Sequence, residues 1–366
     1  MSQNLEPNHE GDFTFAVEEP FVLGSGGMLR PLTLHYAWYG AMNEARDNVI
    51  LVCHALSGSA RIGDWWSDLL GPGKPFDTSR FCVLGINVIG SCYGSTGPAS
   101  MCPATGRPYG GDFPVVSIMD MVRTQAKLLD HLGIDRLHTV VGGSIGGMQA
   151  LAWAASFPER VQRCIAIGAV PLTAMGLALS HLQRQAIRSD PAWRGGHYAP
   201  GAQPVAGLAL ARAIATCTYK SDELFRERYG RRPDRAGEDP TKDHAHRFDV
   251  AGYLDLQGRR FIERFDANSY LVISRAQDTF ELGKDPGEEA EILRQVRAHV
   301  LLIGITRDWL FPPDEVRGLA ERMQAAGVSA TYAQIATNHG HDGFLAHPEL
   351  LGPLLVGAIE APIANY

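Results

Sequence analysis

The sequence predicts an α/β protein in which a helical lid is inserted into a doubly wound, mostly parallel β-sheet. Short apolar runs that suit buried strands alternate with helical patterns as far as residue 169. The pattern is then mainly helical from Pro171 to about Arg297, and the alternation resumes at His299. We therefore expect a polar N-terminal tail over residues 1–12, a sheet domain built from residues 13–169 and 298–366, and a lid over residues 170–297.

The composition is that of an ordinary globular protein. The chain has 366 residues, a net charge of -7 and 45% hydrophobic residues, so it offers no basic surface for nucleic acid or anionic lipid. No stretch resembles the roughly 18 apolar residues of a membrane-spanning helix, and Met1–Asp12 is polar and acidic rather than a secretion signal. We expect a cytoplasmic protein that binds neither nucleic acid nor membrane.

The six cysteines are scattered and include no C-x-x-C pair. Cys53, Cys82 and Cys164 lie in apolar, strand-like runs. Buried free thiols are therefore expected in preference to disulfides or zinc ligands.

The first part of the chain is predicted to be rich in strands. Phe13–Gly40 has the alternating apolar pattern of antiparallel strands around a turn at Gly24–Gly27, and Asn48–Cys53 and Phe81–Val88 are apolar enough for buried strands. The long loop Ile89–Asp112 is rich in Gly, Ser and Pro. Loops of this length in compact domains are usually functional or disordered, and aromatic residues make this one too apolar for disorder.

A helix and a further strand complete the first βαβ unit. Ser117–Leu132 is predicted to be an amphipathic helix, because Ser117 and Asp120 form a capping-box pattern at its start and Gly133 stops it. Arg160–Gly168 is the strand that follows the next turn. This alternation is typical of a parallel sheet.

The segment Thr139–Met148, between these elements, holds the only G-x-S-x-G pattern of the chain, at Gly142, Ser144 and Gly146. An apolar strand precedes it, and helix-forming residues follow until Pro158. A strand, a sharp glycine turn and a helix make a nucleophile elbow. Ser144 is thus the candidate nucleophile, expected to stand exposed at the carboxyl end of its strand. The alternative is a glycine-rich turn that only permits close packing or cradles a phosphate.

The expected lid contains several helical patterns: Met175–Arg188, Gly207–Thr218, Ser221–Tyr229 and Val250–Phe265. A charged stretch, Arg231–Arg247, lies among them. Its histidines, His244 and His246, lack a convincing third ligand, so no metal site is expected. A lid excludes water, which matters for an enzyme whose acyl intermediate must not be hydrolysed.

The last part of the chain supplies a candidate acid and base. Asp308 follows the apolar strand His299–Ile305, and His341 follows the last strand, Ala330–Ile335. Serine, acid and histidine in this chain order, with each after a strand, form the catalytic triad of this kind of fold. Taken singly, Asp308 is more often a turn former, and His339 competes with His341 for the role of base.

The oxyanion hole of such an enzyme takes one N–H from the residue after the nucleophile and another from a loop after an early strand. The first is Ile145. The loop His54–Ser59 follows the strand Asn48–Cys53 and consists mostly of small residues whose amides can point inward. Leu56 is the candidate for the second donor, although an ordinary strand-to-helix connection is an equal alternative.

Four segments together carry a family resemblance: Cys53–Ser59, Gly85–Pro98, Gly142–Gln149 and Gly340–Asp342. They resemble the homoserine O-acetyltransferases of methionine biosynthesis, which belong to the α/β-hydrolase superfamily. The similarity covers nearly the whole chain from about Phe13, the lid included. The long loop and the elbow are far more specific than G-x-S-x-G alone.

This resemblance implies the α/β-hydrolase fold and a ping-pong transfer of an acetyl group from acetyl-CoA to the side-chain hydroxyl of L-homoserine. No bound cofactor is implied, because acetyl-CoA is a co-substrate. Ser144, deprotonated by His341, would attack the thioester, and Asp308 would orient His341. The amides of Leu56 and Ile145 would hold the oxyanion.

The resemblance also implies an acceptor site and a homodimer that forms through lid helices. Arg212, on a lid helix, would bind the carboxylate of homoserine, and Asp342 would bind its ammonium. From the sequence alone, Arg212 is more often a solvated helix residue. Relatives that use succinyl-CoA carry arginine after the Asp-Trp of the late strand, whereas this chain has Leu310. That difference favours acetyl-CoA.

Two residues depart from the family pattern: Ser57 replaces the expected threonine, and Ile145 replaces the usual methionine. Both touch the acceptor side. An L-serine O-acyltransferase of cysteine biosynthesis, using acetyl-CoA or succinyl-CoA, is therefore the nearest alternative. A plain serine esterase would have no use for Arg212 or Asp342, and a binding protein on this scaffold would normally have lost a member of the triad.

Overall fold

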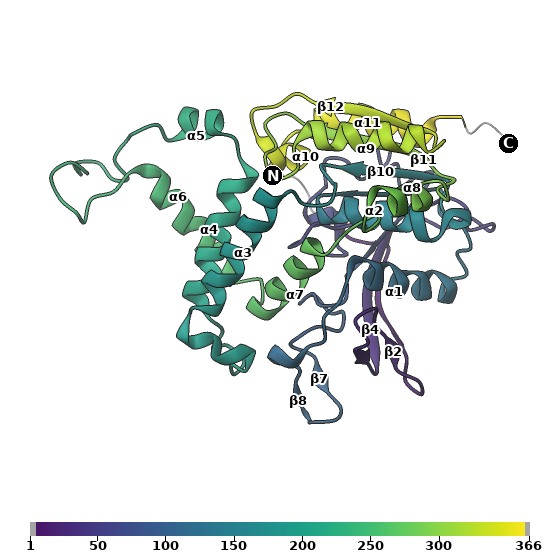
Figure 1. Cartoon of the computed structure of the whole chain (residues 1–366), viewed down its shortest axis with the longest axis horizontal. Helices are drawn as coiled ribbons and strands as arrows, with labels where there is room; N and C mark the ends of the chain where they lie inside the picture. The colour runs from purple at the N-terminus through teal and green to yellow at the C-terminus, as the bar shows by residue number, and fades with distance from the viewer. Residues whose placement is uncertain (1–4, 363–366) are drawn as a thin grey trace.

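An eight-stranded sheet forms the centre of the protein (Figure 1). The structure, a computed structural model, describes residues 5–362. The strand order is β1-β4-β6-β5-β9-β10-β11-β12; β1, β4 and β6 pair antiparallel, and every pair from β6 to β12 is parallel. The sheet strands are β1 (His9–Phe15), β4 (Leu32–Tyr39), β5 (Val49–Cys53), β6 (Cys82–Ile86), β9 (Thr139–Gly143), β10 (Arg163–Ile167), β11 (His299–Ile305) and β12 (Ala330–Ile335).

Two short hairpins lie outside this sheet. They are β2 (Phe21–Val22) with β3 (Met28–Leu29), and β7 (Met101–Cys102) with β8 (Arg107–Pro108). The first confirms the predicted turn at Gly24–Gly27, and Gly26 has the positive φ that such a turn needs.

Helices cover both faces of the sheet. They are α1 (Ile118–His131), α2 (Ile145–Ser156), α9 (Pro313–Ala325), α10 (Gly343–Ala346) and α11 (Pro348–Glu360). Successive residues of a strand point to opposite faces, and β9 shows the result: Val140 belongs to the core that packs against α1, α2 and α9, whereas Val141 belongs to the core that packs against α11. The predicted doubly wound sheet is confirmed.

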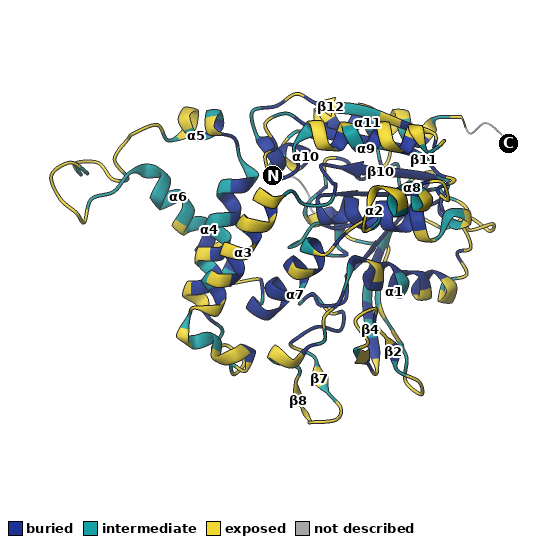
Figure 2. Cartoon of the chain, viewed as in Figure 1, coloured by how far each residue is buried: buried dark blue, intermediate teal, exposed yellow. Residues whose placement is uncertain are grey.

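Six helices separate β10 from β11 in the chain: α3 (Ala174–Arg188), α4 (Val205–Tyr219), α5 (Asp222–Arg228), α6 (Asp249–Ile262), α7 (Ala267–Asp278) and α8 (Pro286–Leu293). In Figure 1, α3 to α6 stand to one side of the sheet, and α4 packs against α3 and α6. The inner strands β5, β6, β9 and β10 are buried throughout, and Figure 2 shows the segment between α5 and α6 largely exposed. That segment includes the charged stretch Arg231–Arg247.

Local signals in the sequence predicted several elements well. The strands β5, β11 and β12 agree with the predicted ranges to within one residue. Helix α1 has the capping box of Ser117 and Asp120, and Gly133 follows it with φ +66°. Cys53, Cys82 and Cys164 are buried free thiols, as expected.

One predicted boundary was wrong. The polar tail was expected to extend to residue 12, but β1 begins at His9 and pairs with β4 from His9 opposite Trp38. β1 is an edge strand whose even-numbered residues are polar and exposed to solvent. It therefore lacks the continuous apolar run that predicts an inner strand.

Between residues 5 and 362, no helix combines the length and the apolar character that crossing a bilayer requires.

Candidate active site

Ser144 lies at the turn between β9 and α2, and its φ of 59° is rare for a residue with a side chain. The turn is tight: a Cβ on Gly146 would lie 2.1 Å from the carbonyl oxygen of Cys53, and one on Gly143 would lie 2.5 Å from the ring of Phe344. This is the predicted elbow. Ser144 is only 8% exposed, however, so the expectation that it stands open to solvent was wrong. Ser144 lines a pocket to which residues of helices α3, α4 and α7 also contribute. The sequence does not show that these helices lie near Ser144.

The other two predicted catalytic residues, His341 and Asp308, are in contact with each other. His341 Nδ1 lies 2.7 Å from Asp308 Oδ2, and both side chains are buried. The other oxygen of Asp308 accepts hydrogen bonds from the amides of Leu310 and Phe311. The carboxylate is thus held in one orientation by its own chain, and it fixes the ring of His341 with Nε2 directed away from it. His339 does not contact Asp308; it bonds to His347.

The electrostatic setting of His341 suits a base. Burial alone would lower the pKa of His341, because it disfavours the charged ring. The charge and hydrogen bond of Asp308, with the charge of Asp342, outweigh burial and raise the pKa of His341 above its ordinary value. The histidine is therefore well placed to accept a proton from a nucleophile and to stay charged until it returns that proton.

Ser144 and His341 line the same pocket, whose volume is about 90 Å³. Across residues 5–362, no hydrogen bond joins the two side chains. Such bonds are often long in unliganded enzymes and shorten when substrate binds.

The two predicted oxyanion donors also reach this region. Ile145 is the first residue of α2, so its amide has no acceptor within the helix. Leu56 lines the pocket beside Ser144. In the described part of the chain neither amide donates a hydrogen bond to another protein group.

His54 is a buried residue whose hydrogen bonds could not be predicted from the sequence. Burial lowers the pKa of His54 to about 4, so the ring is neutral at physiological pH. Its Nε2 accepts a hydrogen bond from the amide of Val88, which places the ring proton on Nδ1, 2.8 Å from the carbonyl oxygen of Ala55. The neutral ring thereby connects Ala55, the residue before Leu56, to Val88 in the loop that follows β6. The only signal in the sequence for this hydrogen-bonded, buried ring is that His54 directly follows a predicted buried strand.

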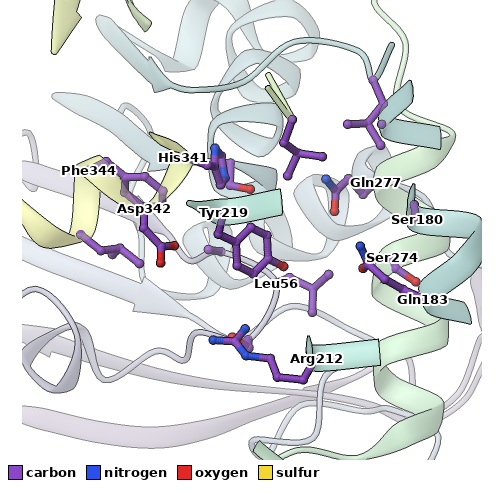
Figure 3. Close-up of a pocket in the computed structure, with 17 residues that line it drawn as sticks. Leu56, Ser180, Gln183, Arg212, Tyr219, Ser274, Gln277, His341, Asp342 and Phe344 are labelled. Atoms are coloured by element: carbon purple, nitrogen blue, oxygen red, sulfur yellow. The ribbon is translucent and has the colours of Figure 1, made fainter. Parts of the chain in front are cut away.

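Arg212 and Asp342, predicted to bind the acceptor, line the pocket with Ser144 and His341 (Figure 3). The guanidinium of Arg212, on α4, lies over the rings of Tyr219 and Phe261. Arg212 forms no ion pair with any residue in the range 5–362. A half-buried, aromatic-backed cation without a protein counter-ion can bind a carboxylate.

Asp342 already has a cationic partner that was not predicted from the sequence. Lys220, at the end of α4, places its Nζ 2.7 Å from Asp342 Oδ2, and its side chain is only 12% exposed. The two residues are 122 positions apart in the chain, so no local pattern linked them. Ser221 and Arg228, which follow Lys220, also bond to Asn338 and His339 in the loop before His341.

The far side of the pocket is polar. Ser180 and Gln183 on α3 and Ser274 and Gln277 on α7 line it, opposite Asp342 and Phe344 in Figure 3. A larger cleft of about 710 Å³ adjoins the pocket and shares four lining residues with it: Ala55, Ser57, Arg212 and Leu345. Among residues 5–362, no three His, Cys, Asp or Glu side chains are grouped so as to hold a metal ion.

Comparisons with known proteins agree with this geometry. Residues 48–348 match the family model of the alpha/beta hydrolase fold. A homoserine O-acetyltransferase of Symbiobacterium thermophilum is 47% identical over 95% of this chain and 92% of its own length. A homoserine O-succinyltransferase of Bordetella pertussis is 43% identical over 90% of this chain and 83% of its own length.

Solved structures extend the likeness to the whole fold. The crystal structure of homoserine O-acetyltransferase from Bacillus anthracis has a TM-score of 0.89 at 27% identity, over 99% of this chain and all of that one. That of esterase E22 has a TM-score of 0.87 at 27% identity, over 96% of this chain and all of that one. The family model and the curated relatives together show that the chain belongs to the homoserine O-acetyltransferase family of the α/β-hydrolase fold.

Proposed function

We propose that the protein transfers an acetyl group from acetyl-CoA to the side-chain hydroxyl of L-homoserine by a two-step mechanism at Ser144. The observation that carries the proposal is one pocket lined by Ser144, by His341 in contact with Asp308, and by Arg212, a cation without an ion-pair partner among residues 5–362. A hydrolase needs the first two. A group that binds an amino-acid carboxylate is needed only when a second substrate must be held.

In the first step, His341 Nε2 takes the proton of Ser144 as its Oγ attacks the thioester carbonyl. The oxyanion that forms accepts hydrogen bonds from the amides of Leu56 and Ile145. The C–S bond then breaks, the thiolate takes the proton from His341, and free CoA leaves. The adjoining cleft offers the long CoA chain a path to the pocket. Ser144 remains as an acetyl ester.

In the second step, His341 takes the proton of the homoserine hydroxyl, whose oxygen attacks the acetyl ester. The same two amides hold the second oxyanion. The ester bond to Ser144 breaks, Ser144 recovers the proton, and O-acetyl-L-homoserine leaves. The charge of Asp308 stabilises the imidazolium in both steps. This product belongs to methionine biosynthesis.

Acetyl-CoA is proposed as the donor because the pocket residue after Trp309 is Leu310, a buried apolar side chain that offers no cation to a succinyl carboxylate.

A homodimer is proposed, formed through the lid helices. Several large apolar side chains on α3 and α4 are exposed, which is unusual unless a partner covers them: Met175, Leu177, Leu182, Val205 and Leu210.

The proposal is tested by measuring thiol release from acetyl-CoA and succinyl-CoA with L-homoserine, L-serine or no acceptor, and by identifying products by mass. Release beyond one equivalent of CoA that requires homoserine and yields O-acetylhomoserine would support it. Preference for serine or succinyl-CoA would keep the mechanism and change the substrate. Equally fast, continued release without an acceptor would make the protein a hydrolase, as the name of esterase E22 says of that protein.

Replacing Arg212 with glutamine is expected to raise the KM for homoserine by about ten- to a hundred-fold, because a charge-assisted bidentate contact worth about 1.5–3 kcal/mol is lost. Acetylation of Ser144 by acetyl-CoA should continue, since it does not use the acceptor site. Steady-state kinetics and mass spectrometry of the acyl-enzyme measure the two effects. Arg259→Gln on α6, also a lid arginine but outside the pocket, is the control. Loss of acetylation in the Arg212 variant would assign this residue to the donor or to folding.

Replacing Lys220 with methionine is expected to lower the KM for homoserine about two- to five-fold. The acceptor ammonium then no longer competes with Lys220 for Asp342, and a partly exposed ion pair is worth about 0.2–1 kcal/mol. Lys220→Arg, which keeps the cation, should leave the KM near its original value. A higher KM in Lys220→Met would mean that Lys220 holds Asp342 in place instead of competing for it.

A further inference from the structure

Two glutamine side chains lie in the apolar core beneath the catalytic serine, and the mechanism above does not use them. Gln125 on α1 and Gln149 on α2 are each 1% exposed. Burying an amide costs free energy unless its hydrogen bonds are made. Their partners therefore indicate what the two residues are for.

The two amides form a chain of hydrogen bonds with one possible direction. The indole Nε1–H of Trp153 can only donate, and it donates to Gln125 Oε1 at 2.8 Å. Gln125 must then present its NH₂ group to Gln149 Oε1, also at 2.8 Å. The NH₂ group of Gln149 is consequently directed at two backbone carbonyl oxygens, those of His54 and Ile145, each at 3.3 Å.

These two carbonyls belong to the two halves of the oxyanion hole. Ile145 is itself one donor residue, and His54 begins the oxyanion loop, His54–Ser59, which carries the Leu56 amide. The first turn of α2 packs directly on the end of β5, because Gly146 leaves no room for a Cβ beside Cys53. The side-chain NH₂ group of Gln149 donates hydrogen bonds to both sides of this contact, to His54 after β5 and to Ile145 in α2.

We propose that Gln149 is a positioning residue that holds the oxyanion loop at a fixed distance from the Ile145 amide, and that Gln125 and Trp153 keep its donor group pointed at that loop. The inference rests on the proposed function, since it assigns Gln149 to the oxyanion hole of that reaction. An oxyanion hole depends on preorganised donors whose positions do not have to adjust during the reaction. The chain Trp153–Gln125–Gln149 supplies this rigidity from within the core.

Gln149→Met is expected to slow single-turnover acetylation of Ser144 by about ten-fold or more, less than the 10²–10³-fold lost when a donor is removed outright. The KM for homoserine should not change, because Arg212 and Asp342 are untouched. A general loss of folded protein would instead lower the amount of acyl-enzyme formed and leave its rate unchanged. Acetylation rate, acyl-enzyme yield and KM are therefore measured together.

Gln125→Met tests the chain at a residue that does not contact the oxyanion loop. A methionine side chain gives Trp153 only a weak acceptor and cannot donate to Gln149. The NH₂ group of Gln149 is then no longer kept pointed at the His54 and Ile145 carbonyls. We expect slowed acetylation here too. Thr124→Val is the matched control: it removes a neighbouring buried polar group of α1 that bonds only to Met121, and the rate should be unchanged.

Acetylation of Gln149→Met at the wild-type rate would overturn the inference. If that variant did not fold, Gln125→Met alone would decide in the same way. An equal slowing by Thr124→Val would also overturn it, because the effect would then follow any loss of a buried hydrogen bond. Failure of the wild-type protein to form an acetyl ester would instead remove the proposed function, and this is measured first.

Discussion

Ser144→Ala is expected to reduce acetyl transfer by about 10⁴–10⁶-fold, the range typical for loss of an enzyme's nucleophile. The residual rate would come from the oxyanion amides and substrate binding, which do not depend on the hydroxyl. Incubation with acetyl-CoA in the absence of acceptor should add one acetyl group to the wild-type protein and none to the variant. Intact-protein mass spectrometry and peptide mapping measure this directly.

Two further variants give the result its meaning. Ser156→Ala, at the exposed end of the same helix α2, should be acetylated like the wild type. Ser144→Cys should still accept an acetyl group, because a thiol is also a nucleophile. If Ser144→Ala transferred acetyl at a normal rate, the acetyl group would have to pass directly from CoA to the acceptor, and the two-step mechanism would be wrong.

The elbow was predictable because local chain geometry determines it. A serine with positive φ between a strand and a helix needs small neighbours, and the glycines that allow the turn are visible in the sequence. The contact between Asp308 and His341 was predictable for a related reason. Each follows a strand of a parallel sheet, and the carboxyl ends of those strands meet at one edge.

The features that were missed depend on contacts between distant parts of the chain. Lys220 meets Asp342 only because the end of α4 packs against the loop before His341. Ser144 is buried because lid helices contribute to its pocket. In both cases the apolar pattern predicts where the helices are in the chain, but it does not predict how the lid packs against the sheet domain. The surroundings of Lys220 and Ser144 depend on that packing.

The buried amides show the same limit. Gln125 lies in the apolar stripe of α1, where its place in the helix was predicted but its hydrogen bonds were not. Its partners, Gln149 and Trp153, are 24 and 28 positions away. Helical periodicity reports which face of a helix is buried. It does not report which donor meets which acceptor inside the core.

Asp308→Asn is expected to lower the acetylation rate by about 10⁴-fold, although it keeps the shape of the side chain. The amide oxygen can still accept from the amides of Leu310 and Phe311, so its NH₂ group faces His341. His341 Nδ1 must then accept, and the ring proton moves to Nε2. A protonated Nε2 cannot take the proton of Ser144.

The same substitution predicts a change in pH dependence. In the wild type, Asp308 and Asp342 raise the pKa of His341, so the acetylation rate should fall as the pH drops through a value above about 6.5, the ordinary pKa of histidine. A raised pKa means that the protonated, inactive ring is favoured up to a higher pH. Without the Asp308 charge, the residual activity should persist to a lower pH.

Stopped-flow measurement of CoA release at a series of pH values, with saturating acetyl-CoA, gives both quantities for each protein. Asp314→Asn, an exposed aspartate at the start of α9, is the control and should leave the rate and the profile unchanged. An acid limb at the same pH in wild type and Asp308→Asn would show that another group titrates there. His341 would then lose its assignment as the base whose ionisation limits acetylation, and the proton of Ser144 would have to go elsewhere.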